Sequence, residues 1–419
     1  MSDQVGSLLA LFKEELKKAA TNLLKSKFRW VKLVFHDDAD GASSAAIIYA
    51  SLKKMGISPS LLCLEKAFPE ALSLIHKDEG GLVIYTDIGS AHADLIAKLN
   101  EDRNLTIILD HHDAQPSPSP YVINLNPELY RVSGELYASG ASVCYAFAKS
   151  MGIAEPFMAA LAVIGSAEVP GVPLGLNEEA LKDASYSGLV ETSYRGKEVK
   201  ILVDLRGKKE TREKWSTKLT ILSSVGYYIG GPNTAVDLCL GEVDDDEVES
   251  LLNRLEEQRR AASQLLLSRI RMEGLKKERA VQWFHAGDAF RGMGTKVIGT
   301  FLSFLSFQHR FIDRKKYLVG FMNVQPEIPG LGELKRSYAK VSARAPDVLA
   351  ELIRQGARPP LSKLLSSAAK RIEGFADGHD TAASGIIPRG SEDQLIKYMD
   401  QLVGGETPGK SPSLLEFMR

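Results

Sequence analysis

Short apolar runs alternate with longer helical patterns through the first 125 residues. Stretches with apolar residues at helical spacing, about 43–54 and 91–99, follow two of these runs. Runs this short and apolar are typical of strands buried on both faces, and strands alternating with helices predict a parallel sheet with right-handed crossovers. The predicted strands are 31–35, 60–64, 82–85, 105–109 and 121–125.

The second half begins with a long helical pattern. Apolar residues recur at helical spacing from about residue 244 to 270, with charged residues between them. The pattern opens on acidic residues, which favour the helix macrodipole. Further apolar runs at 281–284, 317–321 and 338–342 predict strands, and 296–307 predicts a helix. A chain of 419 residues is too long for one ordinary core, so we expect at least two domains.

Composition excludes several classes of protein. The chain is 44% hydrophobic and 25% charged, with a formal net charge of −1, which is typical of soluble globular proteins. Contact with nucleic acid would therefore need local basic patches. The three cysteines lie far apart, without a disulfide or zinc pattern. No stretch has the length of a membrane span or the apolar core of a signal peptide, so we expect a cytoplasmic protein without membrane contact.

Ionisable residues gather where three of the predicted strands end. In an open α/β sheet the site lies beyond the carboxyl ends of the strands, and adjacent strands are only about 4.8 Å apart. Unpaired buried charge is costly, whereas imidazole and carboxylate groups are common ligands of divalent metals. We therefore predict that these side chains converge on a metal site. The three clusters are His36/Asp38/Asp40, Asp87 and Asp110/His111/His112.

An ordinary structural explanation also exists for each of these residues taken singly. Aspartate caps helix N-termini and forms turns, and histidine is common in loops. Three strand ends with the same ligand chemistry favour the metal site over this explanation. A carboxylate such as Asp87 could bridge two ions roughly 3.5–4 Å apart, which would clamp the attacking and leaving oxygens of a phosphoryl displacement.

The same residues carry a resemblance to a known family. The three clusters resemble the first three motifs of the DHH phosphoesterases, in the branch of RecJ and the archaeal RecJ-like nucleases. Residues 135–148 resemble the family's serine- and glycine-rich helix start. Residues 162–168 resemble the fourth motif, with Glu168 where aspartate is usual. Residues 340–344 and 378–385 resemble the companion DHHA1 domain, although the glycine run before His379 is reduced.

The resemblance implies an architecture as well as a site. It implies an α/β protein with an N-terminal parallel-sheet DHH domain at residues 1–240 and a smaller α/β DHHA1 domain at 280–419. A helical linker at 241–279 would join them, with a cleft between the two domains. Residues 407–413 are rich in proline, glycine and serine and are expected to form a mobile tail.

Roles for individual residues follow from the resemblance. His36 and Asp38 would bind one metal ion, Asp87 would bridge, and Asp40, His111 and Glu168 would bind a second. The ions would be Mn²⁺, with Mg²⁺ possible. His112 would contact the scissile phosphate or assist the leaving group, and Asp110 would orient a histidine. The expected substrate-binding residues of the DHHA1 domain are Ser342, Arg344, Gly378, His379 and Thr381, with Arg344 and His379 as phosphate clamps. Asp37 carries no family role and is expected to be a solvent-facing turn residue.

The implied activity is single-strand-specific exonucleolytic hydrolysis of DNA or RNA to nucleoside monophosphates, in DNA repair or replication. The segment 175–241 is short, so docking of the replication complex GINS is not expected. The chain would be closer to the Hef-associated nuclease, which implies 3′→5′ polarity and a Hef-type repair helicase or nuclease as partner. Two alternatives stay open: an oligoribonuclease or cyclic-dinucleotide phosphodiesterase, and a non-catalytic replication scaffold.

A basic run before Trp215 has two interpretations. It could hold a phosphate backbone, with Trp215 as a stacking platform for a base. It could equally be a solvated loop with one anchored aromatic residue. The basic residues are Arg206, Lys208, Lys209, Arg212 and Lys214.

Overall fold

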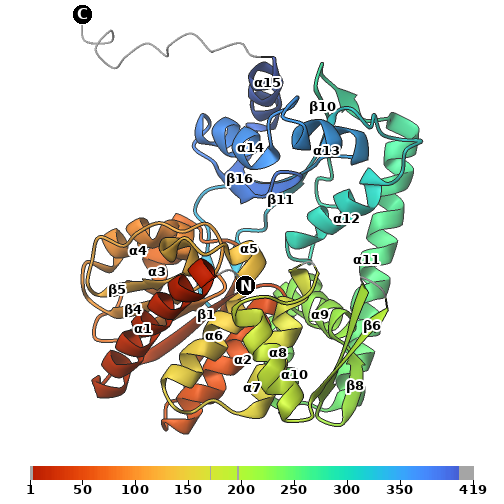
Figure 1. Cartoon of the computed structure of the whole chain (residues 1–419). Helices are drawn as coiled ribbons and strands as arrows, with labels where there is room; N and C mark the ends of the chain where they lie inside the picture. Colours follow the sequence, from red (N-terminus) through yellow and green to blue (C-terminus); the bar gives the residue numbers. More distant parts are fainter. Residues whose placement is uncertain (1–2, 170, 196–197, 405–419) are drawn as a thin grey trace, which may run out of the picture. The chain divides into compact units, whose positions relative to one another are not determined.

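The computed structural model describes residues 3–404 except 170 and 196–197 (Figure 1). The chain divides into two compact units. Unit 1 comprises Met1–Glu256 with the short later segments Gly292–Gly294 and Glu327–Glu333, and unit 2 comprises the remaining residues. The division falls within one long helix. The expected mobile tail at 407–413 lies outside the described residues.

Unit 1 is built on a five-stranded sheet in which every neighbouring pair is parallel. The strand order is β2-β1-β3-β4-β5. The predicted parallel sheet is therefore confirmed, and each predicted strand agrees with the structure to within one residue at either end. The strands are β1 (Val31–His36), β2 (Ser60–Leu64), β3 (Leu82–Thr86), β4 (Leu105–Leu109) and β5 (Val122–Leu125).

Helices cover both faces of this sheet (Figure 1). Helices α2, α6 and α7 pack on one another against one face, and α3 and α4 lie together on the other. The α-helices of unit 1 that precede residue 190 are α1 (Asp3–Lys25), α2 (Ala39–Lys54), α3 (Pro69–Ile75), α4 (Ala93–Asn100), α5 (Gly134–Tyr137), α6 (Gly140–Ser150), α7 (Pro156–Gly165) and α8 (Leu176–Tyr186).

The turn from β1 into α2 determines how the first cluster is presented. Asp38 is the N-cap of α2, and its side chain accepts a hydrogen bond of 2.9 Å from the Gly41 main-chain N–H. A Cβ at residue 41 would lie 2.2 Å from the main-chain oxygen of His36, so only glycine allows this tight turn. The turn therefore keeps His36 and Asp38 within one short segment at the carboxyl end of β1.

A small antiparallel sheet follows α8, and the apolar pattern of the sequence does not predict it. It consists of β6 (Val190–Arg195), β7 (Glu198–Leu205) and β8 (Lys208–Thr211), followed by α9 (Arg212–Thr220) and α10 (Gly231–Leu240). The segment between the fourth motif and the long helix is thus a folded module. A short β-hairpin, β12 (Glu327–Ile328) and β13 (Gly332–Glu333), also belongs to unit 1.

Trp215 is not available as a stacking platform, so that interpretation is wrong. The residue lies in α9, is only 2% exposed, and donates a hydrogen bond of 3.1 Å from Nε1 to the main-chain oxygen of Val203. The alternative is right that Trp215 is an anchored aromatic residue. It is wrong about a solvated loop, because four of the five basic residues lie on β8 and α9 and pair with carboxylates. These pairs are Lys208 with Asp245, Lys209 with Glu191, Arg212 with Glu213, and Lys214 with Glu210.

The long helix α11 (Asp245–Glu273) leads into unit 2, whose mixed sheet has the order β15-β16-β14-β11-β10-β9. Helix α12 (Lys296–Ser306) packs against β11 and β14. A buried core on the other face joins the sheet to α13 (Asp347–Arg354), α14 (Leu361–Lys370) and α15 (Glu392–Val403). The strands are β9 (Lys276–Lys277), β10 (Val281–His285), β11 (Tyr317–Asn323), β14 (Tyr338–Arg344), β15 (Phe375–Gly378) and β16 (Ala382–Pro388).

This unit confirms the expected smaller α/β domain. Strands appear at all three predicted positions, and α12 lies where the apolar helix was predicted. Among the helices that the structure describes, none combines the length and apolar character needed to cross a membrane.

Candidate metal centre

His36, Asp38 and Asp87 form the first of two groups of ligand atoms at the carboxyl ends of the strands. They come from the end of β1, the N-cap of α2 and the end of β3. His36 Nδ1 lies 2.8 Å from Asp38 Oδ2 and 3.6 Å from Asp87 Oδ2. One ligand atom from each residue lies within 4.8 Å of the other two. The group is mostly shielded from solvent, since both carboxylates are buried.

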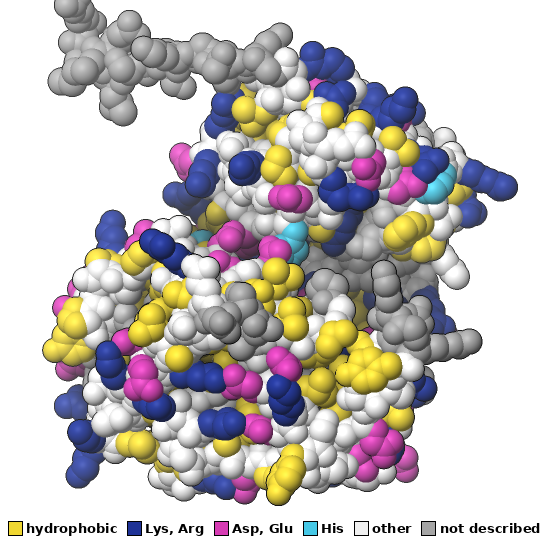
Figure 2. Space-filling view, viewed as in Figure 1, with side chains coloured by type: hydrophobic (Ala, Val, Ile, Leu, Met, Phe, Trp, Pro, Cys, Tyr) yellow, Lys and Arg dark blue, Asp and Glu magenta, His cyan; other side chains and the backbone are white. Residues whose placement is uncertain are grey.

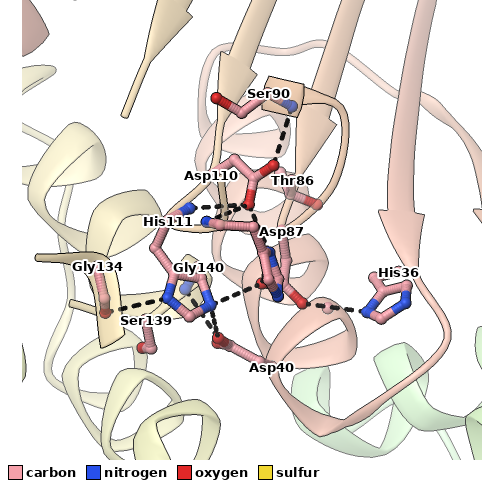
Figure 3. Close-up of polar contacts among 12 residues, drawn as sticks. His36, Asp40, Thr86, Asp87, Ser90, Asp110, His111, Gly134, Ser139 and Gly140 are labelled. Carbon is pink, nitrogen blue, oxygen red and sulfur yellow. Dashed lines mark hydrogen bonds and ion pairs between the residues drawn. The ribbon is translucent and has the colours of Figure 1, made fainter. Parts of the chain in front are cut away.

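Asp87 also belongs to the second group, with His111 (Figure 3) and with His112. Its Oδ1 lies 3.4 Å from His111 Nε2 and 3.8 Å from His112 Nδ1. Its two oxygens thus face different sets of partners. Asp87 has a left-handed backbone with φ 61°, which is uncommon for a residue other than glycine, and such strain often marks functional positions.

Asp40 adjoins the second group without belonging to either. Its Oδ2 lies 3.5 Å from His111 Nε2, and its two oxygens accept hydrogen bonds from the main-chain N–H groups of Gly140 and Ala141 at the start of α6. Burial and the neighbouring charge of Asp38 raise the pKa of Asp40. A nearby cation would favour its ionised form.

Glu168 lies outside both groups of ligand atoms. It ends a short 3₁₀ turn (Ser166–Glu168) after α7, and its side chain is exposed. Its charge nevertheless contributes to the raised pKa of Asp40, so the two carboxylates are near one another. Its role as a ligand of a second ion remains a prediction.

Asp110 holds the two histidines that follow it in place. Its Oδ1 accepts hydrogen bonds from the main-chain N–H groups of His111 (2.8 Å) and His112 (3.2 Å), and its Oδ2 accepts one from Ser90 N–H (3.0 Å). His112 Nδ1 lies 2.8 Å from the same Oδ1. Burial raises the pKa of Asp110, but the charge and hydrogen bond of His112 outweigh this effect and lower it overall. Asp110 is therefore ionised and orients the His112 ring.

His111 is in the form that a metal ligand needs. Burial, followed by the charge of His112, lowers the pKa of His111 to about 4, so the ring is neutral near pH 7. Its Nδ1 lies 3.2 Å from the main-chain oxygen of Gly134, which favours a proton on Nδ1 and a lone pair on Nε2. That lone pair lies on the side of Asp40 and Asp87.

The donor set fits divalent metal ions. Imidazole nitrogens and carboxylate oxygens converge in two groups that share Asp87. Among the described residues, His36 Nδ1 has no hydrogen-bond partner of acceptable geometry although it is buried. A buried imidazole nitrogen that faces two carboxylates without hydrogen bonding is typical of a ligand position.

Two acidic residues near the site differ from the sequence analysis. Asp37 is only 1% exposed and its Oδ1 lies 3.3 Å from His36 Nε2, so its assignment as a solvent-facing turn residue is wrong. Glu65 was missed: it follows β2, is 5% exposed, and accepts a hydrogen bond from the Tyr228 hydroxyl. Its position after an apolar strand next to β1 was the signal that could have identified it.

The expected substrate-binding residues of unit 2 gather near one end of its sheet. Ser342 and Arg344 lie on β14, opposite Ser384 and Ala382 of β16. Gly378 ends β15 with φ 138°, and a Cβ there would lie 2.5 Å from the Ala383 Cα. His379 and Thr381 lie in the turn to β16, where the Ala345 N–H donates to the Thr381 oxygen.

Arg344 has no carboxylate partner within the part of the chain that the structure describes. Its guanidinium donates to Ser303 Oγ and to the main-chain oxygens of Gly299 and Ala343, which are all neutral. Burial lowers the pKa of Arg344, yet an arginine remains charged at neutral pH. A partly buried cation with neutral partners is suited to an anion, so we propose a phosphate-binding role for this residue.

The chain is similar to known proteins in its sequence and in its fold. The model of the DHH family, N-terminal domain, matches residues 30–166. An uncharacterized protein of Methanocaldococcus jannaschii is 28% identical over 178 residues, which cover 41% of this chain and 40% of that relative. The match thus spans less than half the length of the relative.

Solved structures share the fold at low sequence identity. RecJ of Thermus thermophilus in complex with Mn²⁺ is 17% identical, with a TM-score of 0.60 over 93% of this chain and 55% of that one. The DHH domain of a member of a family of ribosomal proteins gives a TM-score of 0.61 at 16% identity, over 94% and 92% of the two chains. Cdc45 of Entamoeba histolytica gives 0.52 at 10% identity, over 95% and 99%. The chain therefore carries an N-terminal domain of the DHH family and has a RecJ-like fold.

Proposed function

We propose that this protein is a metal-dependent phosphodiesterase that degrades single-stranded nucleic acid from an end. The observation that carries the proposal is the position of Asp87, whose two oxygens face two groups of imidazole and carboxylate ligands. A carboxylate shared by two ligand groups is the arrangement that a two-ion site for phosphoryl displacement requires. The RecJ-like fold supports the same reaction class by analogy.

The ligand chemistry supports two divalent ions, Mn²⁺ in the first place and Mg²⁺ as a substitute. His36 and Asp38 would hold one ion and His111, with Asp40 beside it, the other, with Asp87 between them. Ions bound there would neutralise phosphate charge and activate a water molecule. The similar RecJ structure was solved with Mn²⁺, which is consistent with this choice.

The residues of the chain would divide the remaining work by position. The His112 side chain is about half exposed, and Asp110 fixes its ring. His112 can therefore hydrogen-bond the scissile phosphate or give a proton to the leaving oxygen. His111 is neutral and stays a ligand, and the buried carboxylates position it. Arg344 of unit 2 would hold a backbone phosphate.

We expect the Asp110→Asn variant to lower the rate of hydrolysis roughly 10- to 100-fold at saturating Mn²⁺. Asparagine keeps the shape, but one oxygen becomes an NH₂ group that faces either the Ser90 N–H or the histidine N–H groups. The His112 ring would lose its fixed orientation. Initial rates with a labelled single strand measure the effect, and a variant with the wild-type rate would rule out the orienting role.

Products from substrates labelled at either end test the proposed function. With Mn²⁺ we expect single-stranded DNA or RNA to be shortened one nucleoside monophosphate at a time. The expected 3′→5′ polarity rests on the sequence resemblance alone. EDTA should abolish the reaction, because the carboxylate and imidazole ligands cannot by themselves supply the positive charge that stabilises the transition state. Duplex substrates serve as the control, and cleavage of duplex and single strand at equal rates would contradict the proposal. Preference for di- or cyclic dinucleotides would identify the small-substrate alternative.

A non-catalytic scaffold is the second candidate, and the similarity to Cdc45 over almost the whole of both chains favours it. Glu168, exposed and outside the two ligand groups, is the feature of the site that agrees with it. Calorimetric titration with Mn²⁺ separates the two candidates. Binding of one or more ions with micromolar affinity supports the enzyme, whereas no binding in the millimolar range supports the scaffold.

A further inference from the structure

The segment from the end of α12 to the start of β11 interleaves exposed aromatic and basic residues. Phe304 is 47% and Phe307 74% exposed, which is unusual for phenylalanine. The side chains of His309, Arg310 and Lys315 are also exposed. All belong to unit 2. We call Phe304, Phe307, Arg310 and Lys315 the α12 patch, and Figure 2 shows basic, histidine and hydrophobic side chains gathered where this helix ends.

Packing of the core does not explain the two phenylalanines. The buried face of α12 is complete without them, since it already contains Val297, Ile298, Phe301, Leu302 and Leu305. Phe304 and Phe307 are three positions apart, so they lie next to each other on the helix surface. Two adjacent exposed aromatic rings form a platform rather than a single exposed residue.

The cations of the patch are available, in contrast to those near Trp215. Among the described residues, Arg310 and Lys315 form no ion pair, whereas Lys208 and Lys214 each pair with a carboxylate. The neighbouring Arg314 is bound by Asp347. The loop between Arg310 and Lys315 is anchored at Phe311, because the Arg271 guanidinium lies 5.2 Å from the centre of the Phe311 ring.

Arg344, a partly buried arginine of the sheet, also contacts the helix that carries the patch. Arg344 Nε donates a 3.0 Å hydrogen bond to Ser303 Oγ, and Ser303 directly precedes Phe304. A strand with a phosphate at Arg344 would therefore lie beside the helix whose end carries the two rings. Stacked bases and paired phosphates on one surface are the chemistry by which proteins hold single strands without reading sequence.

We propose that the α12 patch is a binding track for single-stranded nucleic acid, on which Phe304 and Phe307 stack against bases while Arg310 and Lys315 contact phosphates. This inference rests on the proposed function, because it names the path of the substrate strand outside the metal centre. On this proposal, unit 2 holds the part of the strand that lies outside the metal centre.

Binding measured without hydrolysis tests the track. In EDTA, fluorescence anisotropy with a labelled thymidine 15-mer should show at least ten-fold weaker binding for the double variant Phe304→Ala/Phe307→Ala. The wild type should bind a 15-mer of abasic sites as weakly as the double variant binds the thymidine 15-mer. The double variant should bind the two oligomers equally, because it has no rings left on which bases could stack. Arg310→Ala/Lys315→Ala should bind both oligomers more weakly, with a salt dependence reduced by about two phosphate contacts.

Two further variants keep the result interpretable. Tyr186→Ala removes a 96% exposed aromatic side chain from unit 1 and should bind like the wild type. Phe304→Trp/Phe307→Trp changes the same two positions but keeps aromatic rings there, so it should retain binding. A variant that had lost its fold would not bind. Equal binding of the wild type and the double alanine variant, or weak binding by the tryptophan variant, would overturn the track. The proposed function fails separately, if the wild type binds in EDTA but hydrolyses nothing with Mn²⁺.

Discussion

Replacement of Asp87 by asparagine is expected to reduce hydrolysis by about 10³-fold or more, because both ligand groups lose their shared carboxylate. Several kcal/mol of charge stabilisation depend on the ions, and each 1.36 kcal/mol corresponds to a factor of ten in rate. Asparagine tolerates the left-handed backbone of this residue, so the fold should remain intact. Initial rates with Mn²⁺ and calorimetric titration of the ion measure the two effects.

Asp94→Asn supplies the matched control. Asp94 is an exposed carboxylate in the first turn of α4, outside both ligand groups. This variant should keep the wild-type rate and Mn²⁺ affinity. A retained rate in the Asp87 variant would exclude the shared-carboxylate site, and loss of activity with unchanged Mn²⁺ affinity would exclude Asp87 as a ligand.

The variant Gly140→Ala is expected to lose at least about 10²-fold in rate, although it adds only a methyl group and removes no ligand. A Cβ at this position would lie 2.5 Å from Asp87 Oδ1 and 2.6 Å from its Cβ. The main-chain N–H of the same residue donates to Asp40 Oδ2. Two carboxylates would have to move, and a misplacement of about 1 Å can cost a factor of 10².

Gly152→Ala separates this effect from a general loss of stability. Gly152 follows the same helix with φ 73°, and a Cβ there would meet no atom within 4 Å. It should lower the unfolding temperature without a change in rate at 25 °C, whereas Gly140→Ala should lower both rate and Mn²⁺ affinity. A Gly140→Ala enzyme with the wild-type Mn²⁺ affinity would contradict the steric argument.

Features set by local pattern could be predicted from the sequence. The five parallel strands are short, mostly apolar runs, and the three inner ones are largely buried, so each was visible by itself. The convergence of His36, Asp87 and His111 followed from topology, because carboxyl ends of parallel strands share one edge. The family resemblance then assigned roles that the pattern alone left open.

Features that depend on tertiary contacts could not be predicted in this way. β6 and β8 are polar segments (VETSYR and KKET) whose pairing is set by β7, so they lack an apolar signature. Trp215 is buried and hydrogen-bonds to β7 of that sheet, and two of its basic neighbours, Lys208 and Lys209, pair with acids from other segments. Asp37 is buried although it lies in a run of polar residues, between His36 and the Asp38 N-cap of α2.

The backbone of Asp87 places two independent demands on one residue. Its oxygens require a carboxylate, and its φ of 61° requires a residue that tolerates the left-handed region. Glutamate meets only the first demand and asparagine only the second, so no single substitution preserves both chemistry and conformation. Position 87 therefore has almost no neutral neighbours in sequence space, and a loss of function there would be hard to reverse by compensating changes elsewhere in the chain.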